Sequence, residues 1–379
     1  MRRSIPLATL LVLCCSVGAG AQSCTQNAAV KYLRADLALR QSYPLPPDAA
    51  LTLEKALQAP LDSDDEKLVA AAGEAFAELR HGSVLKNCDW AVSAEDGPLA
   101  NTAHRGAVRE IAALSGIRAR IRFRDLDAQG AVNDLFAGIA ASRHLSLDGS
   151  IASVLIAYNL ENTLAEILAQ NLNLLPPSQL QELTMELDAL PSGSTLGKAV
   201  EDEKVIRNGG LLVISDGAKS RDQLIERLLK MAPYLGFNRE LVSEIIDGCG
   251  GSVSGFVKCV EQQESFCASW AARFPLPPEQ FEKRYKSELE PLSKTNPVIR
   301  VMTPNLPRLR WTEAYNQTRR ALLRAAIAIR MDGPKAVDQH PDPYDGKPFS
   351  YKSAERGFRL ESHLKREQEP LSLSVADGR

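Results

Sequence analysis

Apolar side chains recur every three or four residues along most of this chain, which is the spacing of one face of an α-helix. The first such segment covers 25–42 and ends at the proline-rich stretch YPLPPD. The same spacing predicts further helices at 48–58, after the acidic SDDE (63–66) with Ser63 or Asp64 as the cap, up to 124 after the loop 87–98, and at 131–145, 150–173, 177–189, 195–207, 220–235, 238–247, 253–274, 278–289 and 310–331. Short connections rich in proline and glycine are typical of antiparallel neighbours. We therefore expect a mostly α protein, built as a multi-helix antiparallel array.

The segment that ends at Leu145 has the pattern of a helical hairpin, with a long helix to Arg124, the turn DLDAQG and a second helix. Gly130, Ala131, Gly138 and Ala141 permit a close approach between the two helices. The arrangement resembles a tetratricopeptide-type hairpin, although the chain has no clean repeat of about 34 residues.

Two segments interrupt the helical pattern. In NGGLLVISDG, residues 211–214 are apolar and follow two glycines, and we expect a short strand there. The proline-rich stretch TNPVIRVMTPNLPRL (295–309) predicts an extended crossing to the last long helix. The glycine-rich GCGGSVSG (248–255) is the expected hinge, which gives a helical body at 22–248 and a second helical part at 249–331.

After Met331 the period of the apolar positions changes to two residues. Asp345-Gly346 is a hairpin-type turn signal. Phe349 and Tyr351 alternate with polar residues, and GFRLESHL and PLSLSV show the same alternation. We expect three short strands over 332–379, which form a small antiparallel β-cap on the apolar face of the last helix.

The first 21 residues have the pattern of a secretory signal peptide. Arg2 and Arg3 precede an apolar run at 5–17, and Ala19-Gly20-Ala21 is a small-x-small cleavage site. The run is shorter than the roughly 20 residues that span a bilayer. We expect an exported protein, periplasmic or extracellular, with no transmembrane segment in the mature chain. Lipidation of Cys24 is the alternative.

The charge balance bears on the choice of partner. The chain has 45 Lys and Arg residues against 47 Asp and Glu residues, a formal net charge of −2, and loss of the signal removes two arginines. This mild acidity argues against binding to nucleic acid or to anionic lipid. We expect a protein or another component of the cell envelope as the partner.

Five cysteines remain after the signal: Cys24, Cys88, Cys249, Cys259 and Cys267. Exported proteins meet oxidising conditions, which favours disulfides. No CxxC occurs and the five histidines are scattered, so we expect no metal or other cofactor. On one helix Cys259 and Cys267 would lie about 12 Å apart, beyond the reach of about 7 Å for a disulfide. We expect Cys249 to pair with one of them, and Cys24 with Cys88 is a weaker pairing.

Few patterns in the chain suggest catalysis. Ser83-Val84-Leu85-Lys86 fits Ser-x-x-Lys, and SDG (215–217) and KTN (294–296) follow in the order that penicillin-interacting serine enzymes use. Those enzymes need a sheet-rich fold, so we interpret Ser83 as the C-terminal turn of a helix and expect no catalytic residue. Asp338, Asp342 and Asp345 suggest calcium, but turn-forming aspartates beside prolines also explain them.

Two polar series are candidate ligand surfaces. Arg118, Arg120, Arg122 and Arg124 alternate with apolar residues, which on a strand would make an anion-binding face but on the expected helix places them around its axis. Three further residues, Asn159, Asn162 and Glu166, share one face of a helix. They would line a cleft or form the solvated side of an amphipathic helix.

The C-terminal DPYDGKPFSYKSAERGFRL (342–360) resembles the β-cap of type II secretion pseudopilins, in which Asp-Pro-aromatic, Gly-x-Pro, an aromatic and Gly-aromatic-x-Leu follow a long helix. Pseudopilins begin with a transmembrane helix, so the resemblance implies a structural cap and not pilus assembly. With this ending, NCDWAVSAEDGP, GAVNDLFAGIAASRHLS, LGKAVEDEK and NPVIRVMTPNLPRL are similar to a group of uncharacterised exported helical proteins of bacteria. That similarity implies no activity.

Two classes of function remain open. Helical arrays commonly bind proteins along concave surfaces, which predicts an exported interaction or scaffold protein. The alternative is a hydrolase whose unrecognised active site lies in an inter-helical cleft, where acid, base and nucleophile converge in space. The lack of a catalytic pattern favours the first class.

Overall fold

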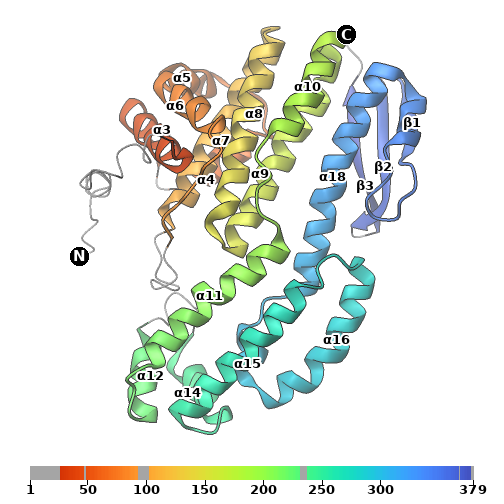
Figure 1. Ribbon diagram of the computed structural model, residues 1–379. Helices are drawn as coiled ribbons and strands as arrows, with labels where there is room; N and C mark the ends of the chain where they lie inside the picture. Colours follow the sequence, from red (N-terminus) through yellow and green to blue (C-terminus); the bar gives the residue numbers. More distant parts are fainter. Residues whose placement is uncertain (1–25, 47, 93–101, 231–236, 367, 377–379) are drawn as a thin grey trace. The chain divides into compact units, whose positions relative to one another are not determined.

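The computed structural model describes residues 26–46, 48–92, 102–230, 237–366 and 368–376. Over these ranges the chain is mostly helical and ends in a small three-stranded antiparallel sheet, which confirms the expected fold class (Figure 1). The helices within these ranges lack the combination of length and apolar character needed to cross a membrane. The expected signal peptide at 1–21 lies outside the described residues.

The chain forms two compact units. Unit 1 comprises the described parts of Met1–Trp90 together with Ala103–Leu147 and Ile156–Gly193. Unit 2 comprises the described parts of Ala91–Thr102, Asp148–Leu155 and Ser194–Arg379. The expected hinge at 248–255 falls inside unit 2.

The regular elements in the described parts of unit 1 are helices, and an isolated parallel bridge joins Asn27 to Asn87. Its elements are α3 (Ala28–Ser42), α4 (Ala49–Ala56), α5 (Ser63–Ala71), α6 (Gly73–Ser83), α7 (Ala103–Arg124), α8 (Ala128–Leu145), the part of α9 (Ile151–Gln170) from Ile156 onward, the short 3₁₀ helix η3 (Leu172–Leu174) and α10 (Pro177–Ala189). Side-chain caps start several of these helices. Asp62 and Asp65 form a reciprocal capping box on α5, and Asp127 accepts from the backbone N–H of Gly130 at 3.0 Å on α8.

The hairpin of α7 and α8 packs closely, as the small residues indicate. Gly138 of α8 faces α7 so closely that a Cβ atom there would collide with Ser115 Oγ, and it would lie 2.9 Å from Leu164 Cδ1 of α9. Gly116 of α7 is crowded in the same way, with Leu57 Cδ2 2.5 Å from the position of a Cβ. Glycine at both positions lets the helix backbones approach one another.

Unit 2 combines helices with the sheet. Its elements after Ser194 are α11 (Leu196–Ser215), α12 (Arg221–Leu229), α14 (Arg239–Gly248), α15 (Val253–Ala271), α16 (Pro278–Thr295), α17 (Pro297–Met302), α18 (Leu306–Asp332), the 3₁₀ helix η4 (Pro334–Gln339), β1 (Ser350–Ala354), β2 (Gly357–Arg366) and β3 (Glu369–Ala376). Trp270 of α15 is fully buried against Phe281 and Tyr285 of α16, at ring-centroid distances of 4.9 and 5.1 Å.

The structure corrects two sequence expectations in unit 2. Residues 211–214 are not a strand: they continue α11, because Leu211 is buried in a core with Leu224 and Ile246. The proline-rich crossing is mostly helical. Asn296 caps α17 by accepting from the N–H groups of Val298 and Ile299, and α18 already begins at Leu306. Prolines stand in the first turn of both helices, where their missing N–H removes no helical hydrogen bond.

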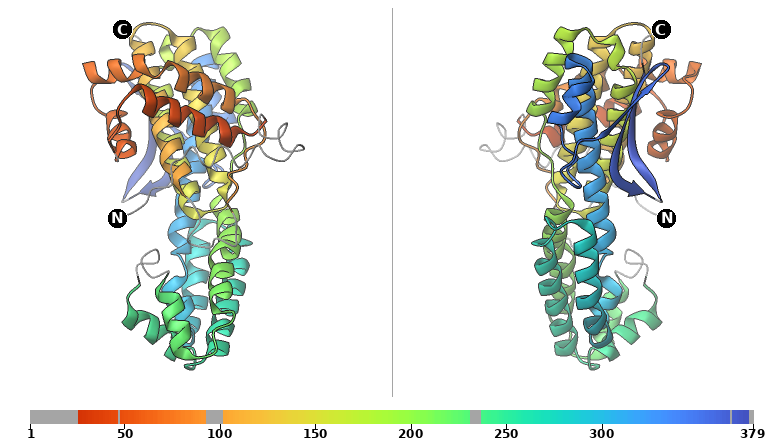
Figure 2. Two further views of the ribbon diagram at one scale, coloured as in Figure 1. Left: turned by 90° about the vertical axis from the view of Figure 1, so that its left-hand side faces the viewer. Right: turned by 90° about the vertical axis from the view of Figure 1, so that its right-hand side faces the viewer.

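The three strands form the expected cap on α18. They pair in the order β1-β2-β3, with Phe358 opposite Val375 and Leu360 opposite Leu373. Both views of Figure 2 show the sheet lying along α18, and β2 and β3 contact that helix. Asp345-Gly346 lies in the turn that leads to the isolated bridge between Pro341 and Pro348, just before β1.

Candidate functional site

A pocket of about 760 Å³ opens in unit 1 where three segments converge. The segments are the end of α6 with the two residues that follow Val84, one face of α8, and the end of α10 with residues 190–193. Small-molecule and peptide sites in proteins have volumes of this order and combine apolar walls with a few polar groups.

The floor of the pocket comes from α8. Asn133, Ala137, Ala140 and His144 line it at the spacing of three to four residues that places side chains on one helix face, and Phe136 lines it beside them. Because Ala137 and Ala140 end at Cβ, this face is hollow between the larger rings. The opposite side of α8 packs on α7 through Gly138, so the close hairpin contact sets the position of the floor.

His144 is fully buried and its two ring nitrogens differ. Nδ1 lies 2.8 Å from the hydroxyl of Tyr32, and the backbone oxygen of His144 accepts from Trp90 Nε1 at 2.8 Å. Among the described residues no group hydrogen-bonds Nε2. Burial lowers the pKa of His144 to about 4, so the ring is neutral at pH 7.

The contact with Tyr32 decides which nitrogen of His144 carries the proton. A phenol is a stronger acid than a neutral imidazole, so we assign the Tyr32 hydroxyl as the donor and Nδ1 as the acceptor. The proton of His144 is then on Nε2. His144, which lines the pocket, therefore carries a buried N–H donor without an acceptor.

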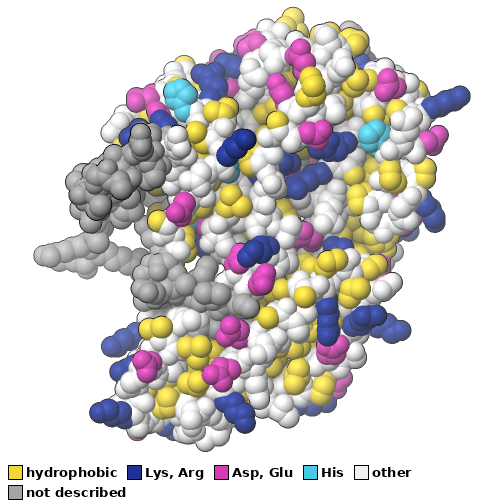
Figure 3. Space-filling view, in the orientation of Figure 1, with side chains coloured by type: hydrophobic (Ala, Val, Ile, Leu, Met, Phe, Trp, Pro, Cys, Tyr) yellow, Lys and Arg dark blue, Asp and Glu magenta, His cyan; other side chains and the backbone are white. Residues whose placement is uncertain are grey.

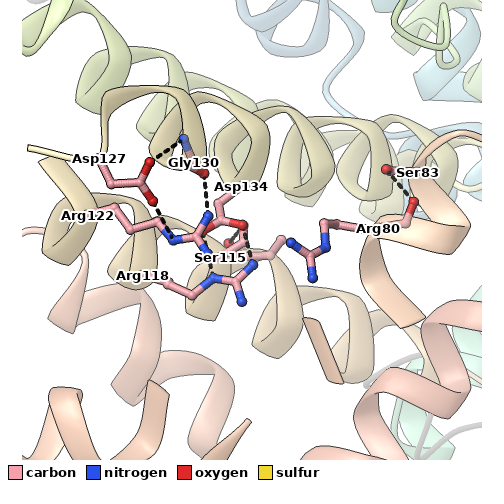
Figure 4. Close-up of polar contacts among 9 residues, drawn as sticks. Arg80, Ser83, Ser115, Arg118, Arg122, Asp127, Gly130 and Asp134 are labelled. Carbon is pink, nitrogen blue, oxygen red and sulfur yellow. Dashed lines mark hydrogen bonds and ion pairs between the residues drawn. The ribbon is translucent and has the colours of Figure 1, made fainter. Parts of the chain in front are cut away.

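Two basic side chains line the same pocket. Arg80 comes from the last turn of α6, and Lys86 follows that helix. Within the described part of the chain, neither side chain makes an ion pair. Figure 4 shows that Arg80 extends toward the pair formed by Arg118 and Asp134. Because Arg80 and Lys86 both line the pocket from this side, the α6 side of the wall is electropositive.

One acidic residue, Glu186 of α10, lines the pocket. Burial raises the pKa of its carboxyl, and repulsion by Glu182 adds to this shift. Among the described residues it forms no ion pair with Arg80 or Lys86, so the acid and the two cations are separate features of the wall.

The rim of the pocket is partly apolar and partly held in place by charge. Val84 and Leu147 line it with 79% and 43% of their surfaces exposed. On the α10 side, Arg143 donates to the carbonyl oxygen of Pro191 at 3.0 Å and pairs with Glu161 at 2.6 Å. Gly193 adopts a φ of +70°, a conformation that suits glycine. These contacts position residues 191–193.

The four arginines of the predicted anion surface are all on α7, and each is engaged within unit 1. Arg118 is buried and makes a bidentate pair with Asp134 of α8, with Nε to Oδ2 at 2.6 Å (Figure 4). The other three bind as follows: Arg120 donates to the carbonyls of Ala56 and Ala59, Arg122 to that of Gly130, and Arg124 pairs with Glu66 and Asp125. The series ties helices together and does not form one surface.

The buried pair of Arg118 and Asp134 is desolvated. Burial raises the pKa of Asp134 and lowers that of Arg118, while their mutual attraction opposes both shifts. The guanidinium of Arg118 also stacks on Phe76, 3.2 Å from the ring centroid. This contact joins α6, α7 and α8 behind the pocket.

The second predicted surface lies on α9 and does not line this pocket. Asn159 and Glu166 are exposed and Asn162 is half-buried. These residues therefore form the solvated side of an amphipathic helix.

The Ser-x-x-Lys pattern falls at the pocket, since Ser83 and Lys86 both line it. Ser83 is the last residue of α6, as expected, and its hydroxyl donates to the carbonyl of Arg80 at 2.9 Å (Figure 4). A nucleophilic serine needs a base that accepts its proton. In unit 2, Ser215 donates to Leu211 O and Lys294 pairs with Glu290, each within its own helix.

The C-terminal aspartates form a turn. Asp342 is buried and accepts from the N–H of Tyr344 at 2.9 Å and of His363 at 3.1 Å, and also from the hydroxyl of Ser362. Asp345 pairs with His363 Nδ1 at 2.9 Å. Asp342, Asp345 and His363 lie close enough together to hold a metal ion. Asp338 is exposed and outside the group. Turn and strand donors account for the oxygens of Asp342.

The expected disulfides are not formed in the structure. Within the described residues no disulfide joins Cys88, Cys249, Cys259 or Cys267, and Cys24 lies outside those residues. Burial raises the pKa of Cys249, and the neighbouring thiol of Cys259 adds to the shift, so these two side chains face one another without a bond. In the regular helix α15, Cys267 lies two turns beyond Cys259.

The residues that define the pocket chemistry, Arg80, His144 and Glu186, were missed at the sequence level. No local pattern marks them: His144 contacts Tyr32, which lies 112 positions earlier in the chain.

Comparisons with known proteins give this site no precedent, since no protein-family model, curated protein or solved structure matches the chain.

Proposed function

We propose that this chain is an exported interaction protein that holds part of its partner in the pocket of unit 1. The observation that carries the proposal is the composition of that pocket. An apolar floor, exposed Val84 and Leu147 at the rim, and a buried His144 Nε2 without an acceptor are combined in one cavity. Buried donors without acceptors cost about 1–3 kcal/mol each, and a bound group with an oxygen acceptor removes that cost.

The features of the pocket favour binding over hydrolysis. The proton of Ser83 is directed to a backbone carbonyl, and a histidine with a pKa of about 4 is a weak base at neutral pH. A hydrolase acting in this inter-helical cleft remains the second candidate, because Ser83, Lys86, His144 and Glu186 all line it. A purified protein that turns over an ester, peptide or glycan, with activity lost in Ser83→Ala, would establish that alternative.

Export and the class of partner are also proposals. The basic, apolar and small-x-small order of residues 1–21 supports export. The near balance of charge supports a protein or envelope partner over nucleic acid, and on the face seen in Figure 3 the two signs of charge are interspersed.

Site-specific photo-crosslinking tests the proposed function. A benzophenone amino acid at Val84, at the rim of the pocket, is expected to give a discrete adduct in the cell envelope. The matched control is Leu51 of α4, which is also an exposed apolar residue of unit 1, at 52%, but does not line the pocket. The Val84 adduct should disappear when Ala140→Leu fills the floor. Equal adducts from both positions, or an adduct that Ala140→Leu leaves unchanged, would contradict the proposal.

A further inference from the structure

The pocket in unit 1 offers hydrogen-bond donors on its electropositive side. Arg80 and Lys86 can only donate, and we assign the free nitrogen of His144, Nε2, as an N–H donor as well. A ligand group that satisfies three donors, two of them cationic, must bring acceptor oxygens and a negative charge. A carboxylate has both.

The floor of the pocket favours an apolar group on the same ligand. Phe136, Ala137 and Ala140 form the middle of the floor and offer no polar side-chain group, whereas Asn133 lies at one end. The rim adds Val84 and Leu147. A sugar or a second charged group on the middle of the floor would lose its water without gaining a partner, which costs free energy. An aliphatic chain has no such cost, and its burial is favourable.

Glu186 restricts the number of charges that the ligand carries. This carboxyl lines the pocket apart from the two cations, and Glu182 lies near it on the same helix. A second anionic group on the ligand would meet this acidic side of the wall. The pocket therefore favours a ligand that carries a single negative charge, at one end of the molecule.

We infer that the pocket binds an aliphatic monocarboxylate, with the chain on the α8 floor and the carboxylate at Arg80, Lys86 and His144 Nε2. This inference rests on the proposed function, since it names the ligand class of the same pocket. Apolar burial holds the chain of the ligand, and charge-assisted hydrogen bonds hold its head group.

Calorimetric titration of the full-length protein with three ten-carbon probes tests the inference. Decanoate, decan-1-ol and decyltrimethylammonium share the aliphatic chain and differ in the charge of the head group. We expect decanoate to bind with a Kd at least about tenfold lower than that of decan-1-ol, as expected for charge-assisted contacts, and the cation to bind most weakly. Decanoate and decan-1-ol binding with equal Kd would overturn the choice of a carboxylate.

Variants identify the groups that act. Arg80→Gln combined with Lys86→Gln should abolish the preference for decanoate and leave the Kd of decan-1-ol unchanged. Lys55→Gln combined with Lys67→Gln, which removes the same number of positive charges from exposed positions outside the pocket, should keep the preference. His144→Phe should weaken decanoate about tenfold, since it removes one hydrogen bond to a charged group. A preference that survives the double variant would overturn the placement of the head group.

The outcomes separate this inference from the proposed function. If decan-1-ol binds as well as decanoate and Ala140→Leu displaces both, the pocket binds ligands but the inferred class is wrong. If no probe binds while Val84 still crosslinks to a partner protein, the inference fails and the proposed function stands. If no probe binds and no adduct forms, both fail.

Discussion

Replacing Gly138 by alanine tests the helix contact that positions the floor of the pocket. The added Cβ would collide with Ser115 Oγ, and it would lie 2.9 Å from Leu164 Cδ1 and 3.4 Å from the carbonyl oxygen of Ala112. Ser115 is fully buried and donates to that same carbonyl at 2.7 Å. Its hydroxyl must therefore move and give up this hydrogen bond, or α7 and α8 must separate.

The magnitude follows from three contributions. Overpacking of a core contact costs about 1–3 kcal/mol. Loss of the hydrogen bond of Ser115 adds about 1 kcal/mol. The better helix propensity of alanine offsets about 1 kcal/mol. We therefore expect Gly138→Ala to lower the free energy of unfolding by about 1–3 kcal/mol.

Gly106→Ala in α7 is the matched control. It lies in the same hairpin, and a Cβ there meets nothing within 4 Å, so it should stabilise the protein by up to about 1 kcal/mol. Urea unfolding of the wild type and both variants, followed by far-ultraviolet circular dichroism, measures the difference between the midpoints. A Gly138→Ala protein that unfolds at the same or a higher urea concentration than Gly106→Ala would refute the close packing of α7 and α8.

Three further predictions concern charge and the C-terminal sheet. Asp134→Asn leaves Arg118 buried without its counter-ion and should cost about 3–5 kcal/mol in urea unfolding, whereas Asp125→Asn, at an exposed pair, should cost less than about 1 kcal/mol. His144 has a pKa of about 4 when folded, below its usual 6.5, so its contribution to stability is complete above pH 6.5 and decreases as the pH falls toward 4. The loss reaches about 3 kcal/mol, and His144→Phe should flatten the pH dependence of the urea midpoint over this range. Truncation after Met331 should lower the melting temperature or give insoluble protein, because it exposes the face of α18 that the sheet covers; unchanged melting would contradict this.

The sequence by itself determined the class of the fold and many helix boundaries. Boundaries were predictable where a local group marks them, as at Pro177, which starts α10, and at Asn238, whose side chain caps α14. The period of two after Met331 likewise predicted the strands. These features depend on the backbone and on nearby side chains, so they can be predicted without knowledge of tertiary contacts.

Tertiary structure decided the segments in which local preference is weak. Residues 211–214 are as apolar as a strand, yet they extend α11 because the buried core around Leu211 stabilises the helix. The arginines of α7 alternate in the sequence, but Asp134, Glu66 and the carbonyls of neighbouring segments determine where each one binds. Such partners are chosen by packing, which the order of residues does not display.

The pocket was the least predictable feature, for the same physical reason. Tyr32 sets the proton position of His144, residues from α6 and α10 supply the charges, and Gly138 sets the depth of the floor. The sequence specifies each of these side chains and the helix that bears it. Only the packing of α6, α8 and α10 against one another brings them to a single cavity, because desolvation and hydrogen bonding depend on distances in space.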